Sequence, residues 1–369
     1  MNSRRLLRRE GTNQRVIFLT GLLILTIIFG GSTSSGFFTA SNLQNLIEDV
    51  MAEGIMTIPL ALVVLTGEID ISLESTLGLA SSLLGYLFLQ GVPIALAMLV
   101  VLVVGGLCGL LNGLLVTRIG LPSLVVTLGT YGLYRGLAYV ILGSTDVSTF
   151  SSNFDAIGTG TVLGVPYALL IFAVVAVVAA VVLRFTGTGR EIYFIGANAE
   201  AAQFCGIPVK RVRTVLFVIA GAVSALAGIV LTSFYSSAQP NNGQGLILTV
   251  LTIVILGGVS LFGGEGSMTG VVLALAVVAV LSNVFVLRNL SGNTITFAIG
   301  ILLVLAVLLP RLAGLIARRR PKNDSTLAKS SDTAPYEFKG GRDDAMLPAP
   351  TTSHPNHQPN QEIPNAIFP

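Results

Sequence analysis

The stretch STLGLASSLLGYLFLQGVPIALAMLVVLVVGGLCGLLNGLLVT, residues 75–117, decides the fold class because it contains no Asp, Glu, Lys or Arg. Residues 214–264 and 289–310 are likewise uncharged. Of the 369 residues, 53% are hydrophobic and 11% are charged, whereas soluble globular chains have roughly 25% charged residues. About 20 apolar residues suffice to cross a bilayer as a helix. The sequence therefore predicts an all-α polytopic membrane protein.

Ten transmembrane helices fit the apolar segments. They are expected at residues 16–31, 47–66, 72–90, 93–116, 121–142, 162–183, 214–235, 246–262, 268–287 and 293–310. Basic residues collect on the cytoplasmic side of membrane proteins. The first 15 residues, the loop 184–213 and the segment after residue 310 are rich in Lys and Arg, whereas loop 143–161 has none. This pattern places both termini in the cytoplasm, which an even number of spans allows.

Three regions follow from the composition. Residues 1–15 are expected to be a cytoplasmic N-terminus, residues 16–316 a transmembrane domain, and residues 317–369 a disordered cytoplasmic tail rich in Pro, Ser, Thr, Asn and Asp. Both histidines lie in the tail, and we expect Cys108 and Cys205 to be unpaired thiols. The sequence therefore predicts no metal site and no cofactor.

The loop 184–213, RFTGTGREIYFIGANAEAAQFCGIPVKRVR, is the long cytoplasmic connection between spans. Asn198 is suited to cap a short helix at residues 199–205, with Glu200 in its first turn, where the helix dipole favours an acid. Gly206 suits the left-handed position that ends such a helix. A plain connector would be shorter. We therefore interpret this helix as a docking surface for a cytoplasmic partner.

Three acids interrupt the apolar sequence at LTGEIDISLES, residues 65–75. We expect them at a break between two spans near the cytoplasmic side, where Glu68 and Glu74 reach water. Asp70 is expected to cap the following helix and to pair with a cation such as Arg135. This structural role is preferred over proton chemistry.

Polar residues within apolar spans are costly to expose to lipid, so they are candidates for lining a translocation pathway or a helix break. They are Asp70, Asn112, Thr127, Tyr131, Arg135 and Asn283. The alternative for the four uncharged residues is an interhelical hydrogen bond, and for Arg135 an ion pair between helices. These alternatives stay open at this point.

Glycines mark two further segments. The segment GGVSLFGGEGSMTG, residues 257–270, lacks the Lys of a phosphate-binding loop, so we interpret it as a turn and expect no nucleotide site. Gly105, Gly109 and Gly113 lie four residues apart, a spacing that lets helix backbones approach closely. We expect this stripe to pack within the chain rather than against a second copy.

Four motifs carry a resemblance over residues 45–310. LTGEIDISLESTLGLA is similar to the G-G-I-D-L-S-V-G-S pattern of bacterial ABC sugar-importer permeases of the ribose, xylose, rhamnose and autoinducer-2 type. Three further stretches are similar to patterns of that family and follow in the family's order along the chain: TLGTYGLYRGLA, GREIYFIGANAEAAQFCGIPV and LGGVSLFGGEGSMTG. Glu68 and Glu74 depart from it, because they replace glycines.

The resemblance implies the ABC-importer permease fold and a pathway for a sugar or sugar-like solute of the ribose, rhamnose or autoinducer-2 class. The chain would be a transporter subunit and no enzyme, in a bacterial inner membrane. Its partners would be a cytoplasmic ABC ATPase, a second permease, identical or paralogous, and an extracytoplasmic substrate-binding protein, with no nucleic acid. The helix 199–205 would be the coupling helix that contacts the ATPase, with the residues Asn198, Glu200, Ala201, Ala202 and Gly206.

Two other classes remain as alternatives. A secondary transporter driven by protons would use Glu68, Asp70 and Glu74, because a carboxylate held at depth can have a raised pKa. The absence of a partner His in the spans argues against it. A membrane scaffold without transport activity would use the helix 199–205 only for docking.

Overall fold

The computed structural model describes residues 3–148 and 150–318 of the chain. Its helices are α1 (Ser3–Thr33), α2 (Ala40–Leu65), α3 (Leu73–Leu89), α4 (Ile94–Leu114), η1 (Leu115–Ile119), α5 (Ser123–Leu142), α6 (Ser152–Thr159), α7 (Tyr167–Phe185), α8 (Gly187–Ala197), α9 (Ala199–Phe204), α10 (Val209–Tyr235), α11 (Leu246–Leu256), α12 (Met268–Leu287) and α13 (Gly292–Arg318). Of the expected tail 317–369, residues 319–369 lie outside the described residues, and residues 317 and 318 belong to α13.

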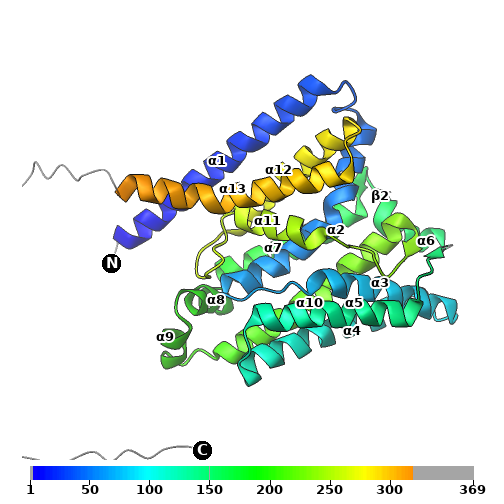
Figure 1. Cartoon of the computed structure of the whole chain (residues 1–369), viewed down its shortest axis with the longest axis horizontal. Coiled ribbons are helices and arrows are strands. Elements are labelled where there is room, and N and C mark those ends of the chain that lie inside the picture. Colours follow the sequence, from blue (N-terminus) through cyan, green and yellow to red (C-terminus); the bar gives the residue numbers. More distant parts are fainter. Residues whose placement is uncertain (1–2, 149, 319–369) are drawn as a thin grey trace, which may run out of the picture. The chain divides into compact units, whose positions relative to one another are not determined.

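Two short antiparallel pairs join the loops. β1 (Val147–Ser148) pairs with β4 (Ser237–Ala238), and β2 (Thr161–Val162) pairs with β3 (Val165–Pro166). These strands and α6 lie at one end of the long helices, whereas α8 and α9 lie at the opposite end (Figure 1). The two ends are called the α6 end and the α9 end below.

Caps and turn residues explain several helix boundaries. The side chain of Thr39 accepts the N–H of Asn42 at the start of α2, and that of Ser267 accepts the N–H of Gly270 at the start of α12. Gly120 adopts a φ of 85° between η1 and α5, a conformation that L side chains rarely adopt. Local sequence thus determines where these helices start and stop.

The glycine stripe of α4 packs within the chain, as expected. A Cβ atom at Gly109 would collide with the backbone of Phe217 in α10, and one at Gly105 would lie 2.6 Å from the carbonyl oxygen of Gly221. Gly113 faces Thr214 in the same way. The absence of side chains lets α4 and α10 approach at backbone distance, which is the reason for this spacing in membrane helices.

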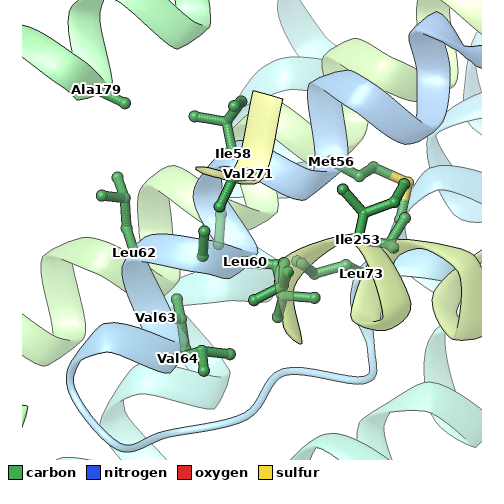
Figure 2. Packing of buried hydrophobic residues seen from close by; sticks show 14 of the residues in the cluster. Met56, Ile58, Leu60, Leu62, Val63, Val64, Leu73, Ala179, Ile253 and Val271 are labelled. Atoms are coloured by element: carbon green, nitrogen blue, oxygen red, sulfur yellow. The ribbon is translucent and has the colours of Figure 1, made fainter. Parts of the chain in front are cut away.

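Helix α2 lies in the centre of the largest hydrophobic cluster. Figure 2 shows Leu60 and Val64 of α2 among Ile253 of α11 and Val271 of α12. These four side chains are at most 1% exposed. In the same view, an irregular loop follows Val64 and leads to Leu73, where α3 begins.

Each expected span corresponds to a helix, with some corrections. Within residues 3–148 and 150–318, six helices are long and apolar enough to cross a membrane, and α3, α11 and part of α13 are shorter apolar helices, so the count of ten stays a prediction. The span expected at 246–262 is wrong at its end, because α11 stops at Leu256 where the glycine-rich turn begins. Helix α2 begins at Ala40, seven residues before the expected 47. The side chain of Thr39 caps the helix there, although the first turns are polar and were therefore not counted as part of a span.

Candidate functional site

Two helices begin inside the protein rather than at its ends. Helix α3 follows an irregular segment, residues 66–72, which enters from the α9 end after α2. Helix α11 follows a second irregular segment, residues 239–245, which enters from the α6 end after β4. Helix α11 has 11 residues and so is about 16 Å long, roughly half of the ~30 Å hydrocarbon core. Such interrupted helices leave backbone groups that the protein must satisfy internally.

The side chain of Glu74 lies between the two helix starts. It belongs to the first turn of α3, and its Oε2 accepts the backbone N–H of Ile247, in the first turn of α11, at 3.1 Å. Tyr131 of α5 donates its hydroxyl to Oε1 of Glu74 at 3.1 Å. One carboxylate, only 1% exposed, therefore stands at two positive helix ends, where negative charge is stabilised.

Arg135 of α5 completes this cluster. Its guanidinium lies 3.1 Å from Oε1 of Glu74 and donates to the backbone carbonyls of Pro240 and Asn242. Gly78 of α3 leaves the space for it, because a Cβ there would collide with the guanidinium. The cation thus neutralises Glu74 and at the same time satisfies the acceptors that the second irregular segment exposes.

The first irregular segment is held by hydroxyls and one carboxylate. Ser123 accepts the N–H of Ile69 at 3.1 Å, and Thr127 donates to its carbonyl at 3.2 Å. Oδ1 of Asp70 accepts both the N–H and the hydroxyl of Ser72, at 2.9 and 2.6 Å. Asp70 therefore bonds to the backbone just before α3, close to the capping role that we expected.

Asn112 of α4 extends this network into the helix bundle. Its amide donates to the Ser72 hydroxyl at 2.7 Å, and its carbonyl accepts the hydroxyl of Tyr134 at 3.3 Å. Asn112 and Asp70 are each 1% exposed, and Ser72 is equally buried. The sequence analysis singled out Asn112 as a polar residue of an apolar span, but offered no reason to connect it with Ser72.

Two expectations about the acids are wrong. Arg135 pairs with Glu74 and not with Asp70, because Glu74 lies on the face of α3 toward α5. Glu74 does not reach water, since it is buried between α3, α5 and the start of α11. Glu68 is different: it lies 2.7 Å from Arg213 of α10 and is 12% exposed, at the α9 end of the break.

The six residues predicted to line a pathway or break fall into two groups. Five of them gather around the two irregular segments, namely Asp70, Asn112, Thr127, Tyr131 and Arg135. Asn283 of α12 lies apart, where its amide exchanges two hydrogen bonds with Asn42 of α2, at 2.9 and 3.0 Å. For Asn283 the structure therefore favours the interhelical hydrogen bond.

The predicted short helix is present as α9. Asn198 accepts the N–H of Ala201 at 2.9 Å, Glu200 lies in the first turn, and Gly206 has a φ of 81°. Ala202 is fully buried and belongs to the largest hydrophobic cluster. On the outer side, Phe204 is 91% exposed, a residue that the sequence reading did not single out.

Helix α8, which sequence reasoning missed, connects α9 to the break. A Cβ at Gly196 of α8 would collide with the carbonyl of Leu65, at the end of α2, and with the backbone N of Gly264. The N–H of Gly264 donates to that same Leu65 carbonyl at 2.9 Å, and the Tyr193 hydroxyl donates to Gly266 at 3.0 Å. The glycine-rich turn, α8 and the end of α2 thus meet at backbone distance.

The second irregular segment lies in the gap that the expected spans left at 236–245, but its position inside the protein was missed. Its sequence, PNNGQG at 240–245, is a turn signature, and Gly243 and Gly245 both have positive φ. The uncharged stretch 214–264 hid it, because a turn placed within a membrane has the same apolar flanks as a span boundary. The role of Glu74 was missed for a different reason. Its partners come from α5 and α11, which are distant in sequence, so no local pattern indicated them.

The cluster around Glu74 suits hydrogen bonding rather than proton transfer. Glu74 and Arg135 neutralise each other, and their remaining bonds go to a phenol and to backbone groups. Among the described residues, no group of three or more metal-ligating side chains occurs. The Glu74–Arg135 pair thus adds no net charge to the junction of the two interrupted helices.

The comparisons with known proteins agree on one family. The model of the "Branched-chain amino acid transport system / permease component" family matches residues 42–309. "Autoinducer 2 import system permease protein LsrD" of Yersinia enterocolitica is 34% identical over 295 residues, which cover 78% of this chain and 89% of that protein. The protein of the same name from Yersinia pseudotuberculosis is 32% identical over the same coverage. No solved structure matches the chain.

Proposed function

The chain belongs to the family of permease components of branched-chain amino acid transport systems, and we propose that it forms the solute pathway of an ATP-driven importer of sugar-like solutes. It is a multi-pass permease of the inner membrane. In the proposed assembly it pairs with a second permease, identical or paralogous, binds a cytoplasmic ABC ATPase through α9, and receives solute from an extracytoplasmic binding protein.

The observation that carries this proposal is the junction of the two interrupted helices. Interrupted helices that meet within the membrane mark solute sites in several transporter folds, because their ends and unwound backbone offer hydrogen-bonding groups. Here the two breaks enter from opposite ends and meet at Glu74 and Arg135. A small shift of either break would change which backbone groups are paired there.

The route from the ATPase to this junction is short. Helix α8 precedes α9 directly and touches the end of α2 through Gly196. From there the chain runs through residues 66–72 to Glu74. A displacement of α9 would therefore be passed through rigid backbone contacts to the break, which is the coupling that an importer needs.

The proposed solute class is small, polar and neutral, with autoinducer 2 as the first candidate. The similar Yersinia proteins are described as permeases of an autoinducer 2 import system. The mutually neutralised pair leaves no net charge to attract an ionic solute, whereas Tyr131, Thr127 and Asn112 offer hydroxyl and amide groups.

Uptake in reconstituted vesicles tests this function. The vesicles contain the full chain with its ATPase and binding protein, and radiolabelled autoinducer 2 is supplied outside. We expect uptake that requires ATP, and no uptake when either partner is left out. Uptake by the chain alone under a proton gradient would overturn the importer proposal in favour of a secondary transporter.

The docking role of α9 is tested by changing its exposed aromatic side chain. Phe204→Ser is expected to weaken capture of the ATPase by the purified permease at least tenfold, since exposed aromatic residues dominate such contacts. Leu163→Ser is the matched control, because Leu163 is fully exposed at the α6 end. Equal capture by both variants would remove α9 from the interface.

The proposed orientation, with the α9 end and both termini in the cytoplasm, has a native probe. Cys205 is exposed beside α9, whereas Cys108 is buried. A membrane-impermeant maleimide is expected to label Cys205 in inside-out vesicles and not in intact cells. Leu163→Cys in a Cys205→Ser background should show the reverse, and labelling of Cys205 in intact cells would invert the topology.

A further inference from the structure

Two cavities adjoin at the start of α10. The first, about 510 Å³, lies between α2, α7 and α10. The second, about 570 Å³, lies between the end of η1 and the linker from α9 to α10. Pro208, Arg211 and Val215 line both of them. Together they form one continuous feature at the α9 end of the helices, which we call the α10 groove.

The two halves of the α10 groove have opposite character. Apart from Thr188, Glu191 and Arg211, the first cavity is lined by apolar side chains, including Ile58, Leu62, Val178, Val182 and Ile219. Val178 is 57% exposed and Ile219 41% exposed, so this half opens to the side of the bundle. The volume is within the range of about 300–1,000 Å³ typical of ligand pockets.

The second cavity is basic. Arg118, Lys210 and Arg211 line it, and none of its lining residues is acidic. All three are exposed, and none of them belongs to either ion pair of the described residues. Lys210 and Arg211 also lie in the first turn of α10, which carries no acid. The positive end of the helix dipole therefore adds to their charge, and an anion would relieve this repulsion.

The length of the apolar half fits one leaflet of a bilayer. Along α10 the lining extends from Val212 to Val223. Eleven residues at 1.5 Å each correspond to about 16 Å, and half of a hydrocarbon core of ~30 Å is about 15 Å. An acyl chain that runs from the basic cavity along this groove would end near the middle of the membrane.

We propose that the α10 groove binds one anionic phospholipid. Its phosphate lies among Arg118, Lys210 and Arg211, and one acyl chain follows the aliphatic cavity between α2, α7 and α10. Basic pockets next to apolar helix faces recognise anionic headgroups in this way. The lipid also braces the linker after α9, because Ile207 and Pro208 line the headgroup cavity.

A second copy of the chain fits this surface less well. A twofold contact places the same patch on both subunits. Three cations without an acidic neighbour in the cavity would then face three more cations. A lipid phosphate supplies the missing charge instead, and its chain covers the exposed aliphatic side chains.

Native mass spectrometry of the full chain tests the proposal. The probes are dioleoylphosphatidylglycerol and dioleoylphosphatidylcholine, titrated into the delipidated protein in detergent. We expect at least tenfold tighter binding of one phosphatidylglycerol molecule. Equal affinity for the two lipids would overturn the proposal, as would displacement of phosphatidylglycerol by an equal concentration of glycerol 1-phosphate, which would indicate a phosphate site without a chain groove.

Variants locate the site. Arg118→Gln/Lys210→Gln/Arg211→Gln is expected to lose at least tenfold in affinity for phosphatidylglycerol, and Arg211→Gln alone about threefold. Arg184→Gln/Arg190→Gln is the matched control, since both residues are exposed near the same end and line neither cavity. Ile219→Trp, which fills the aliphatic half, should weaken the lipid as well. Unchanged binding in the triple variant, or loss of the lipid on dimerisation of the chain, would overturn the proposal.

Discussion

Two ion pairs close the break between α2 and α3, one at each of its ends. Glu68 and Arg213 lie at the α9 end, 2.7 Å apart, and are 12% and 21% exposed. Glu74 and Arg135 lie at the inner end, 3.1 Å apart, and are 1% and 13% exposed. Both acids stand where the resembling permeases have glycine. The shorter pair is thus the one that has more water around it.

The comparison shows that the N–O distance does not decide which of the two ion pairs contributes more to stability. Partly exposed pairs typically contribute about 0–1 kcal/mol, because water and salt screen them and their side chains lose entropy. Removing one partner of a buried pair costs about 3–5 kcal/mol, because the other charge stays behind without compensation. The inner pair also holds backbone groups of a second segment, whereas the outer pair holds only the carbonyl of Thr66.

The largest effect is expected from Glu74→Gln. The amide keeps the shape of the side chain but leaves Arg135, which is 13% exposed, without the carboxylate that neutralises its charge. We expect a loss of about 3–5 kcal/mol in the free energy of unfolding, measured as a lower thermal midpoint in detergent. Uptake should fall to background. Glu265→Gln is the control, since Glu265 is exposed and forms no ion pair in the described residues.

A double-mutant cycle separates the charge from the shape. Arg135→Met added to Glu74→Gln removes both charges at once. We expect the double variant to be more stable than the sum of the single effects by over ~1 kcal/mol, as directly interacting residues show. Additive losses would mean that the inner pair is no more coupled than the outer one, and the comparison would fail.

The sequence predicted one half of this picture. Composition and the four motifs were enough for a polytopic helical permease, and Asn198 and Gly206 were enough for α9, because these signals are local. The ion pair between Glu74 and Arg135 could not be predicted from the sequence. Glu74, Arg135 and Ile247 come from three helices, and nothing in 65–75 shows that a helix start 173 residues later will lie against Glu74.

The second break falls in the gap between the expected spans 214–235 and 246–262, but its depth could not be predicted. Apolar composition cannot distinguish a helix that starts at the membrane surface from one that starts halfway through the membrane. Helix α11 reads as part of a longer segment until its N–H groups are seen to bond to Glu74.

A methyl group at Gly196 is expected to have the next largest effect. Gly196→Ala places a Cβ against the Leu65 carbonyl and the Gly264 backbone, so both segments must shift. Overpacking of this kind costs about 1–3 kcal/mol. Because the shift occurs at the outer end of the break, ATP-dependent uptake should fall further than the lower thermal midpoint alone would explain. Gly129→Ala is the control, since a Cβ there meets open space.

Ser72→Ala tests whether the segment between the pairs acts as a rigid link. The change removes the hydroxyl that donates to Asp70 and accepts from Asn112. Leaving these buried groups without a partner costs about 1–3 kcal/mol. The thermal midpoint in detergent should fall accordingly. Ser75→Ala should cost less, because Ser75 bonds only to the carbonyl of Ser72, and equal losses would contradict the linking role.

The smallest effect is expected from Glu68→Gln, which makes the same chemical change as Glu74→Gln six residues away. Water reaches this pair, so the loss of free energy of unfolding should be about 0–1 kcal/mol. It should also shrink further in 1 M salt, where the Debye length is about 3 Å, whereas the Glu74→Gln loss should persist. Thermal midpoints of both variants at low and high salt make the comparison. The Glu68 variant could instead lose as much free energy of unfolding as the Glu74 variant at both salt concentrations. Burial would then not explain the difference between the two pairs, and stability would give no reason to assign the transport step to the inner junction.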